Sequence, residues 1–162
     1  MTRPQTLLLG LFALGVAAVL AVAVVLATQL QDARAEDQRR EAILQAARQQ
    51  GVNITTLDHR SVDKDLKRVL DLSTGTFRTE FQAGTKDLTD LVVKNKAVST
   101  GEVLAAGIVT ADSDSARVLV VADSTVSNSA NSAQKQVRHY RMQLDLVRRG
   151  DRWLTSTLTF VG

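Results

Sequence analysis

Five ionisable side chains could support acid–base chemistry: Asp58, His59, Asp123, Tyr140 and Asp145. Carboxylates and imidazoles act as general acids and bases when an apolar pocket shifts their pKa values and directs them at a substrate. A set of this kind could transfer protons in an isomerase or a dehydratase. The elements that carry the five side chains decide whether they can meet in such a pocket.

Most of these candidates can be explained by a structural role rather than by a catalytic one. His59 lies where a helix is expected to begin, which favours a capping role or surface exposure. Tyr140 falls on the apolar face of an expected strand, as a core tyrosine with its hydroxyl at the edge would. Asp145 and His139 fall on the opposite, polar face. We therefore assign no catalytic, cofactor-binding or metal-binding residue and expect no cofactor.

Other motifs exclude several classes of site. The chain contains no cysteine, which excludes disulfides, thiolate metal sites and cysteine nucleophiles. Asp112 and Asp114 resemble the start of a calcium loop, but Arg117 and Asp123 occupy the positions where glycine and glutamate are needed. That segment predicts a hairpin turn. Asn53 begins a glycosylation triplet, a pattern that is frequent by chance.

The charge pattern argues against nucleic-acid binding. The chain has 20 basic and 17 acidic residues, a net charge of +3, and no basic run. Charges that are mixed along the chain are typical of a solvated surface rather than of a nucleic-acid footprint.

A long apolar run near the N-terminus predicts a membrane helix. From Leu7 to Ala27, twenty-one residues carry no charged or hydrogen-bonding side chain. As a helix, this run spans roughly 30 Å, the thickness of a bilayer's hydrocarbon core. A cleaved signal has an apolar region of only about 7–15 residues, so we favour a retained anchor at residues 7–28 after a cytoplasmic tail at residues 1–6.

A stalk helix is expected at residues 29–50, which lack proline and glycine and are rich in helix formers. Gly51 is expected to end it as a C-terminal cap. An apolar patch near its end could dock onto the domain; it comprises Ile43, Leu44, Ala46 and Ala47. Lysine and arginine are more numerous after the membrane span than before it, and the positive-inside rule alone would therefore place the large C-terminal part in the cytoplasm.

Residues 51–162 are expected to form one domain that starts with two helices. Ser61 can cap the first, whose apolar residues recur at steps of three and four. These are Val62, Leu66, Val69 and Leu70. Residues 73–76 interrupt the pattern. The second helix begins with Phe77 and Phe81, both expected to face the core, and resumes after Gly84 with Leu88, Leu91 and Val92.

The second half of the domain predicts strands, because its apolar period changes to two. The expected strands are residues 98–111, 117–127, 137–147 and 153–161, with a turn at 112–115 and a loop at 128–134. In the third strand the core-facing residues are Tyr140, Met142, Leu144 and Leu146. Gly150 and Asp151 fit a two-residue hairpin turn, and Leu154, Leu158 and Phe160 are expected on one side of the last strand. Helices followed by a four-stranded antiparallel meander predict an α+β domain.

Several short runs, in the same order, resemble the mammalian-cell-entry (Mce)-associated membrane proteins of actinobacteria. They are residues 57–66, 68–77, 97–101, 140–142 and 152–154. Together with the anchor and stalk, the resemblance covers nearly the whole chain.

That resemblance implies an NTF2-like cone, with helices packed on a curved four-stranded antiparallel sheet. It also implies an N-terminus inside the plasma membrane and a domain outside, which overrules the lysine and arginine count. The family's members accompany Mce transporters, which import lipids and sterols. We expect a single-pass accessory subunit that binds and stabilises Mce transporter proteins or other Mce-associated subunits. The alternatives are a lipid- or sterol-binding carrier domain, or an NTF2-like isomerase or dehydratase.

Overall fold

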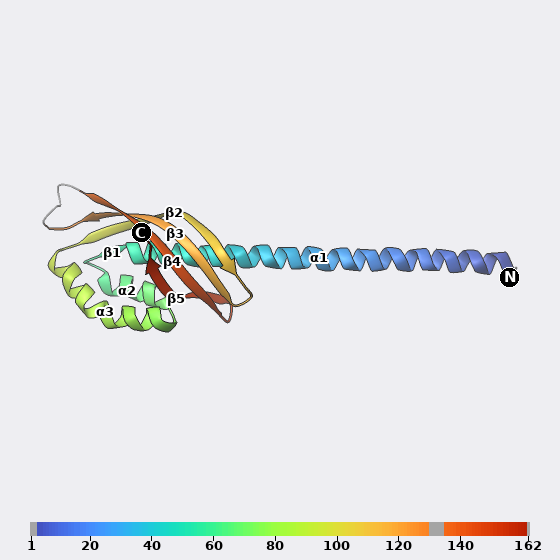
Figure 1. The fold of residues 1–162 in the computed structure, drawn as a ribbon, viewed down its shortest axis with the longest axis horizontal. Coiled ribbons are helices and arrows are strands. Elements are labelled where there is room, and N and C mark those ends of the chain that lie inside the picture. Colours follow the sequence, from blue (N-terminus) through green and yellow to red (C-terminus); the bar gives the residue numbers. More distant parts are fainter. Residues whose placement is uncertain (1–2, 130–134, 162) are drawn as a thin grey trace. The chain divides into compact units, whose positions relative to one another are not determined.

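The computed structural model describes residues 3–129 and 135–161, with the backbone alone for residues 3–25 and Ala27. Its elements are α1 (Arg3–Thr55), β1 (Leu57–Asp58), α2 (Val62–Asp71), α3 (Gly75–Lys94), β2 (Val98–Ala111), β3 (Ser115–Ser127), β4 (Gln136–Arg149) and β5 (Arg152–Phe160), as Figure 1 shows. The chain divides into two compact units, Met1–Arg39 and Arg40–Gly162. The second unit begins within the segment that the sequence assigned to a stalk.

Helix α1 contains the expected membrane span. Residues 7–28 lie almost entirely outside the part of the chain whose side chains are described. Over the described residues, no helix is long and apolar enough to cross a membrane.

The glycine expected to end the stalk lies inside α1, so the predicted stop at Gly51 is wrong: the helix continues to Thr55. A Cβ atom at residue 51 would lie 2.9 Å from Val103 Cγ2 and 3.1 Å from Val120 Cγ1. Gly51 therefore permits close approach of α1 to the sheet. A glycine at the end of an apolar pattern can either cap a helix or allow another element to approach closely, and the sequence pattern does not distinguish the two.

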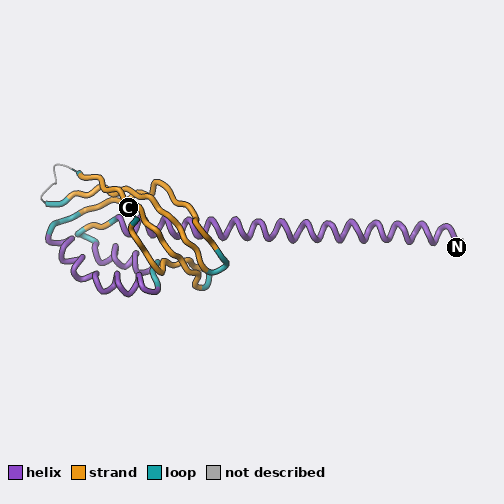
Figure 2. Tube along the Cα trace, viewed as in Figure 1, coloured by secondary structure: helices purple, strands orange, loops and turns teal. Residues whose placement is uncertain are grey.

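The domain has five antiparallel strands rather than four, in the order β1-β2-β3-β4-β5. The additional strand, β1, pairs only with Val98 and Ser99 of β2. Two residues are too few to show a periodic pattern, so the sequence could not reveal it. The predicted hairpin between β4 and β5 is confirmed, with Gly150 at φ +61°. Figure 2 shows α2 beside the last turns of α1 and α3 beside α2.

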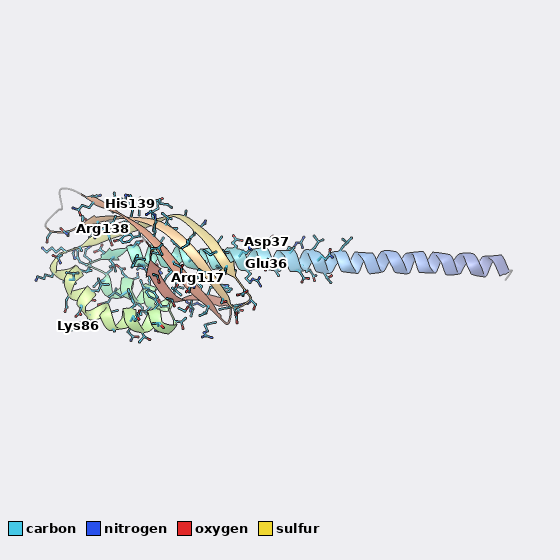
Figure 3. All side chains as sticks on the ribbon, viewed as in Figure 1. Glu36, Asp37, Lys86, Arg117, Arg138 and His139 are labelled. Carbon is cyan, nitrogen blue, oxygen red and sulfur yellow. The ribbon has the colours of Figure 1, made fainter. Side chains whose placement is uncertain are left out.

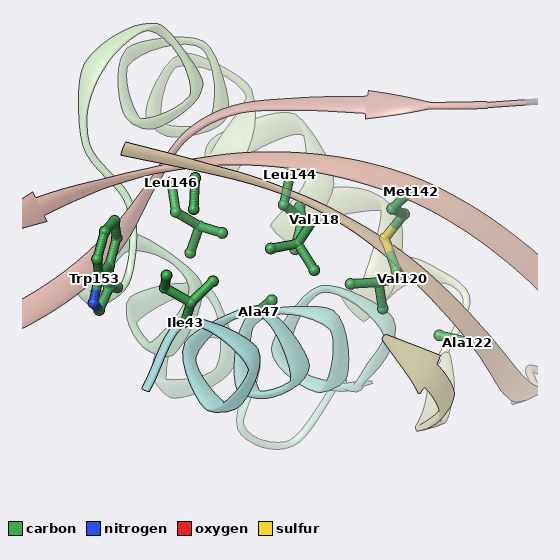
Figure 4. Close-up of a cluster of buried hydrophobic side chains, with 10 residues drawn as sticks. Ile43, Ala47, Val118, Val120, Ala122, Met142, Leu144, Leu146 and Trp153 are labelled. Carbon is green, nitrogen blue, oxygen red and sulfur yellow. The ribbon is translucent and has the colours of Figure 1, made fainter. Parts of the chain in front are cut away.

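The core lies between the C-terminal part of α1 and the sheet. Ile43 and Ala47 are fully buried, which confirms the predicted apolar patch. They face Met142 and Leu144, which are also fully buried, and Tyr140 packs half-buried at the edge of this cluster. Figure 4 shows the α1 side chains directly under those of β3 and β4. The predicted faces of β4 are confirmed.

The last strand departs from its predicted pattern. Leu158 and Phe160 pair with core-facing residues of β4, as expected, but Leu154 does not share their face. Ser156 is left out of the pairing, and before it Trp153 and Thr155 are the buried residues. A bulge adds one residue and reverses the faces on either side of it.

Helices α2 and α3 form a second, smaller cluster. Val62, Leu66 and Val92 are buried there, with Phe81 and Leu88 packed half-buried against them. Phe77 is half-buried and stacks on Phe81, with ring centroids 5.7 Å apart. Helix α3 is continuous through Gly84, whereas Leu91, which belongs to the predicted apolar pattern, is 59% exposed.

Candidate functional site

The turn between β1 and α2 carries two of the acid–base candidates, Asp58 and His59. The Arg60 side chain donates from Nε to both Asp58 carboxylate oxygens, at 2.9 and 3.1 Å. This hydrogen bond, reinforced by the Arg60 backbone N–H, holds the pKa of the Asp58 carboxyl well below its usual range. Such a carboxylate is a poor proton acceptor near neutral pH. His59 is half-buried, and its backbone N–H donates to the Ala97 carbonyl at 3.0 Å.

A residue that the sequence did not single out organises this turn. Asp65 is 3% exposed and accepts a 2.8 Å hydrogen bond from the Asp58 backbone N–H. It also forms a 2.8 Å ion pair with Arg68, and the Ser61 hydroxyl lies 3.3 Å from both its oxygens. The carboxylate thus holds β1 against the first turn of α2. Ser61 precedes the helix as expected, but its side chain makes no cap to the backbone.

Two further candidates, Asp123 and Asp145, lie on the outer face of the sheet; the alternation predicted this for Asp145. The Asp123 carboxylate lies 2.7 Å from His139 Nδ1, and that of Asp145 lies 2.7 Å from Arg117 Nε. These residues are direct neighbours across β3 and β4. Figure 3 labels Arg117 and His139, whose side chains are 49% and 75% exposed. Exposed pairs of this kind contribute little to stability and enclose no substrate.

Tyr140 lies apart from all of these groups. Its side chain is half-buried and stacks on Phe160, with ring centroids 5.9 Å apart. The fold therefore places the five candidates at three separate locations, namely the β1–α2 turn, the outer sheet face and the core edge, and brings no acid and base together in an apolar pocket.

The space between α1 and the sheet, where a cone could hold a ligand, is filled by side chains. Ile43, Ala47 and Gln50 of α1 are all 0% exposed. At Gly51 even a methyl group would overlap Val103. The helix itself occupies the interior along the described length of this interface.

Two buried polar side chains near the end of α1 form its seam with α2: Gln50, which the sequence assigned to the stalk, and Asn53, which it assigned to the domain. Gln50 Nε2 donates to the Val69 carbonyl at 3.2 Å and to Ser73 Oγ at 3.0 Å. Asn53, the residue of the glycosylation triplet, is 4% exposed and donates to the Arg68 carbonyl at 3.3 Å. The sequence did contain a signal for this burial. Gln50 and Asn53 lie three residues apart, shortly after the apolar patch, as polar residues on a second buried side of the helix would.

The described residues also line open surface hollows. A surface groove of about 400 Å³ runs between α2 and α3. Leu66 and Leu70 contribute apolar surface, whereas Lys67 and Lys86 contribute charge. The Asp112–Asp114 segment forms the expected hairpin turn, with Asp112 N–H donating to Ser115 O at 2.8 Å. In the described part of the chain, His, Asp and Glu side chains form no group of three that could hold a metal ion.

Comparisons with known proteins agree with this fold. A family model described as "Uncharacterized protein Rv1363c/MT1408-like" matches residues 7–162. The uncharacterized protein Rv1363c of Mycobacterium tuberculosis (strain ATCC 25618 / H37Rv) is 36% identical over 133 residues, which is 82% of this chain and 51% of that protein. The chain thus spans about half the length of that relative.

Solved structures with similar folds come from more distant proteins. The periplasmic domain of DotI has a TM-score of 0.62 at 16% identity, with 75% of this chain and 94% of that one covered. An IcmL-like type IV secretion system protein from Legionella pneumophila has a TM-score of 0.61 at 12% identity, covering 75% and 91%. VirB8 of Agrobacterium tumefaciens has a TM-score of 0.60 at 8% identity, covering 76% and 92%. At these identities the likeness concerns the fold, an NTF2-like α+β domain with a curled antiparallel sheet.

Proposed function

This chain belongs to the Rv1363c/MT1408-like family. We propose that it is a membrane-anchored accessory subunit that binds other proteins and performs no turnover. The observation that supports this most is the direct packing of α1 on the sheet at Gly51, which leaves no room for a methyl group. A lipid carrier or an isomerase with this fold would need an apolar cavity at that place.

The anchor is the second part of the proposal. The uncharged run from Leu7 to Ala27 supports a single membrane span, and the family resemblance supports an extracytoplasmic domain. Confinement to the membrane plane raises the effective concentration of the domain near membrane partners.

Labelling of a single introduced cysteine tests this topology. The chain has no cysteine of its own that could react with the reagent. A Ser129→Cys variant should react with a membrane-impermeant thiol reagent in intact cells. Labelling only after lysis would reverse the orientation.

The partner class is the third part of the proposal. The resemblance to Mce-associated proteins points to subunits of an Mce-type lipid or sterol importer. One solved neighbour is described as a type IV secretion system protein and another as a periplasmic domain. The use of this fold in such proteins supports a role as a building block of membrane-associated assemblies.

Deletion and complementation test the function directly. Loss of the protein should lower the abundance or the lipid uptake of a cognate transporter, and the wild-type gene should restore both. His59→Ala and Tyr140→Phe should restore them equally well, because neither side chain meets a partner for chemistry. If either variant abolished uptake while the domain stayed folded and the transporter stayed abundant, a chemical role would replace the proposal.

A further inference from the structure

One glycine of the sheet has no contact among the described residues that would exclude a side chain. Gly101 is needed because a Cβ atom there would lie 1.8 Å from Thr55 Oγ1. At Gly107, in the middle of β2, nothing lies within 4 Å of the same position. Glycine weakens a strand, and it is commonly found where a ligand or another backbone approaches closely. Gly107 is exposed, so that approach has to come from outside the domain.

The surroundings of Gly107 are aliphatic. Gly107 pairs with Leu119 and Ala105 pairs with Val121, so the four residues share the outer face of the sheet. Leu119 and Val121 are 43% and 36% exposed. We call these four residues the aliphatic shelf. The small residues lie on the edge strand β2 and the larger ones on β3, which leaves a low strip beside a raised one.

The strand edge next to the shelf limits what can bind there. The pairing of β2 with β3 shifts at Leu104 and again at Val109, and these side chains are 56% and 54% exposed. Such bulges disrupt an edge as a template for a further strand, and only four residues separate them. A helix, which satisfies its own backbone hydrogen bonds, needs no such template. Small residues let its backbone approach closely.

The charges around the shelf specify the partner further. Arg117 and His139 already face Asp145 and Asp123, respectively, on the same side of the sheet. Glu102, exposed on β2 three residues before Ala105, forms no ion pair among the described residues. Arg141, which pairs with Val121 on the same face, also forms no ion pair among those residues. A partner that covers the shelf can therefore gain from a cation beside Glu102 and from an anion beside Arg141.

We propose that an amphipathic helix of a partner protein docks on the aliphatic shelf, with its apolar stripe over Ala105 and Gly107 and a lysine or arginine beside Glu102. This inference rests on the proposed function and identifies the surface that performs it. The protein would then hold its partner through the outer face of the sheet, opposite the face that α1 occupies.

Photocrosslinking in the native membrane tests the surface. A benzophenone amino acid replaces Gln143, which pairs with Leu119 at the rim of the shelf, in the full-length chain. A control crosslinker replaces Lys86 on α3. Sequencing of the Gln143 photoproduct should identify one partner peptide with helical apolar spacing and a basic residue at one end.

Variants in the same background test the contacts. Gly107→Val fills the open position and should lower the Gln143 crosslink at least about tenfold, the loss expected for a central interface residue. The melting temperature of this variant should not fall, because a Cβ atom meets nothing there. Gly84→Val on α3, where a Cβ atom also meets nothing, is the matched control and should leave the crosslink unchanged. Glu102→Lys should weaken the crosslink more than Glu102→Gln.

The outcomes separate this inference from the proposed function. Crosslinks from the Lys86 position alone would overturn the shelf and leave the accessory role intact. Absence of crosslinks from both positions and from a wider surface scan would overturn both. A photoproduct with a second copy of this chain, or a Gly107→Val variant that crosslinks like the wild type, would overturn the partner helix.

Discussion

A matched pair of glycine substitutions measures how tightly α1 fills the cone. Gly51 and Gly84 both lie inside helices, where replacing glycine by alanine stabilises by about 1 kcal/mol. At Gly84 the new methyl group meets nothing within 4 Å, so Gly84→Ala should show this gain in full. At Gly51 the methyl carbon would lie 2.9 Å from Val103 Cγ2, well inside the usual carbon–carbon separation of about 3.5–4.0 Å.

The steric cost at Gly51 should exceed the helical gain. Overpacking a core by one methyl group costs about 1–3 kcal/mol, so Gly51→Ala should change the stability by about 0 to −2 kcal/mol net. The two variants should then differ by about 1–3 kcal/mol. For a domain of this size each kcal/mol shifts the melting temperature by about 3–5 °C.

Thermal unfolding of the full chain in detergent, followed by circular dichroism, is a suitable assay. Val103→Ala removes the nearest methyl group and should recover part of the loss when combined with Gly51→Ala. A Gly51→Ala variant as stable as Gly84→Ala would refute the reasoning. It would mean that α1 and the sheet have room between them, and a carrier function would then regain support.

Three other predictions follow from the contacts. Leu144→Ala should cost about 2–5 kcal/mol and Gln143→Ala close to nothing, and equal effects in denaturant titrations would refute the assigned faces of β4. Asp65→Ala should cost about 2–4 kcal/mol, because it leaves the Asp58 N–H and the Arg68 guanidinium without their acceptor; a loss below about 0.5 kcal/mol would refute the anchoring role. Because Arg60 lowers the pKa of Asp58, the pair stabilises the fold above the ordinary value of 3.8 and loses this effect as the pH falls through the lowered pKa. The difference in unfolding free energy between wild type and Arg60→Ala should therefore shrink as the pH falls below 3.8. A difference that does not change with pH would count against the pair.

The sheet was the part of the fold that the sequence predicted best. Strict alternation in β4 placed Met142 and Leu144 in the core, and Gly150 adopts the positive φ that the hairpin requires. These features depend on neighbours in the sequence. The predicted face of Leu154 was wrong because the bulge at Ser156 reverses the faces of β5. No pattern in the neighbouring residues indicates this bulge.

Long-range packing explains the other differences. Gly51 was interpreted as a cap because its contact, Val103, is distant in the sequence. The anchoring role of Asp65 was missed for the same reason. Its carboxylate binds the backbone of β1, and a strand of two residues is too short to be recognised from the sequence. Strand alternation alone was enough to place Asp145 and His139 on the outer face of the sheet. The aliphatic shelf could be recognised only from the structure, because its residues share a face through the register of β2 against β3, which two bulges shift.

The order of the strands has a consequence for biosynthesis. Because β1 to β5 lie in the sheet in the order of the chain, β3, β4 and β5 each emerge from the ribosome directly after the strand with which they pair, whereas α2 and α3 are made between β1 and β2. Helix α1 is synthesised before any strand, so the growing sheet can assemble on a surface that already exists. Trp153 and Leu158, both on the final strand, are the last side chains of the main cluster to be synthesised. A chain truncated before β5 would leave Leu144 and Leu146 without their neighbouring strand, and cellular proteases should remove such fragments faster than the complete protein.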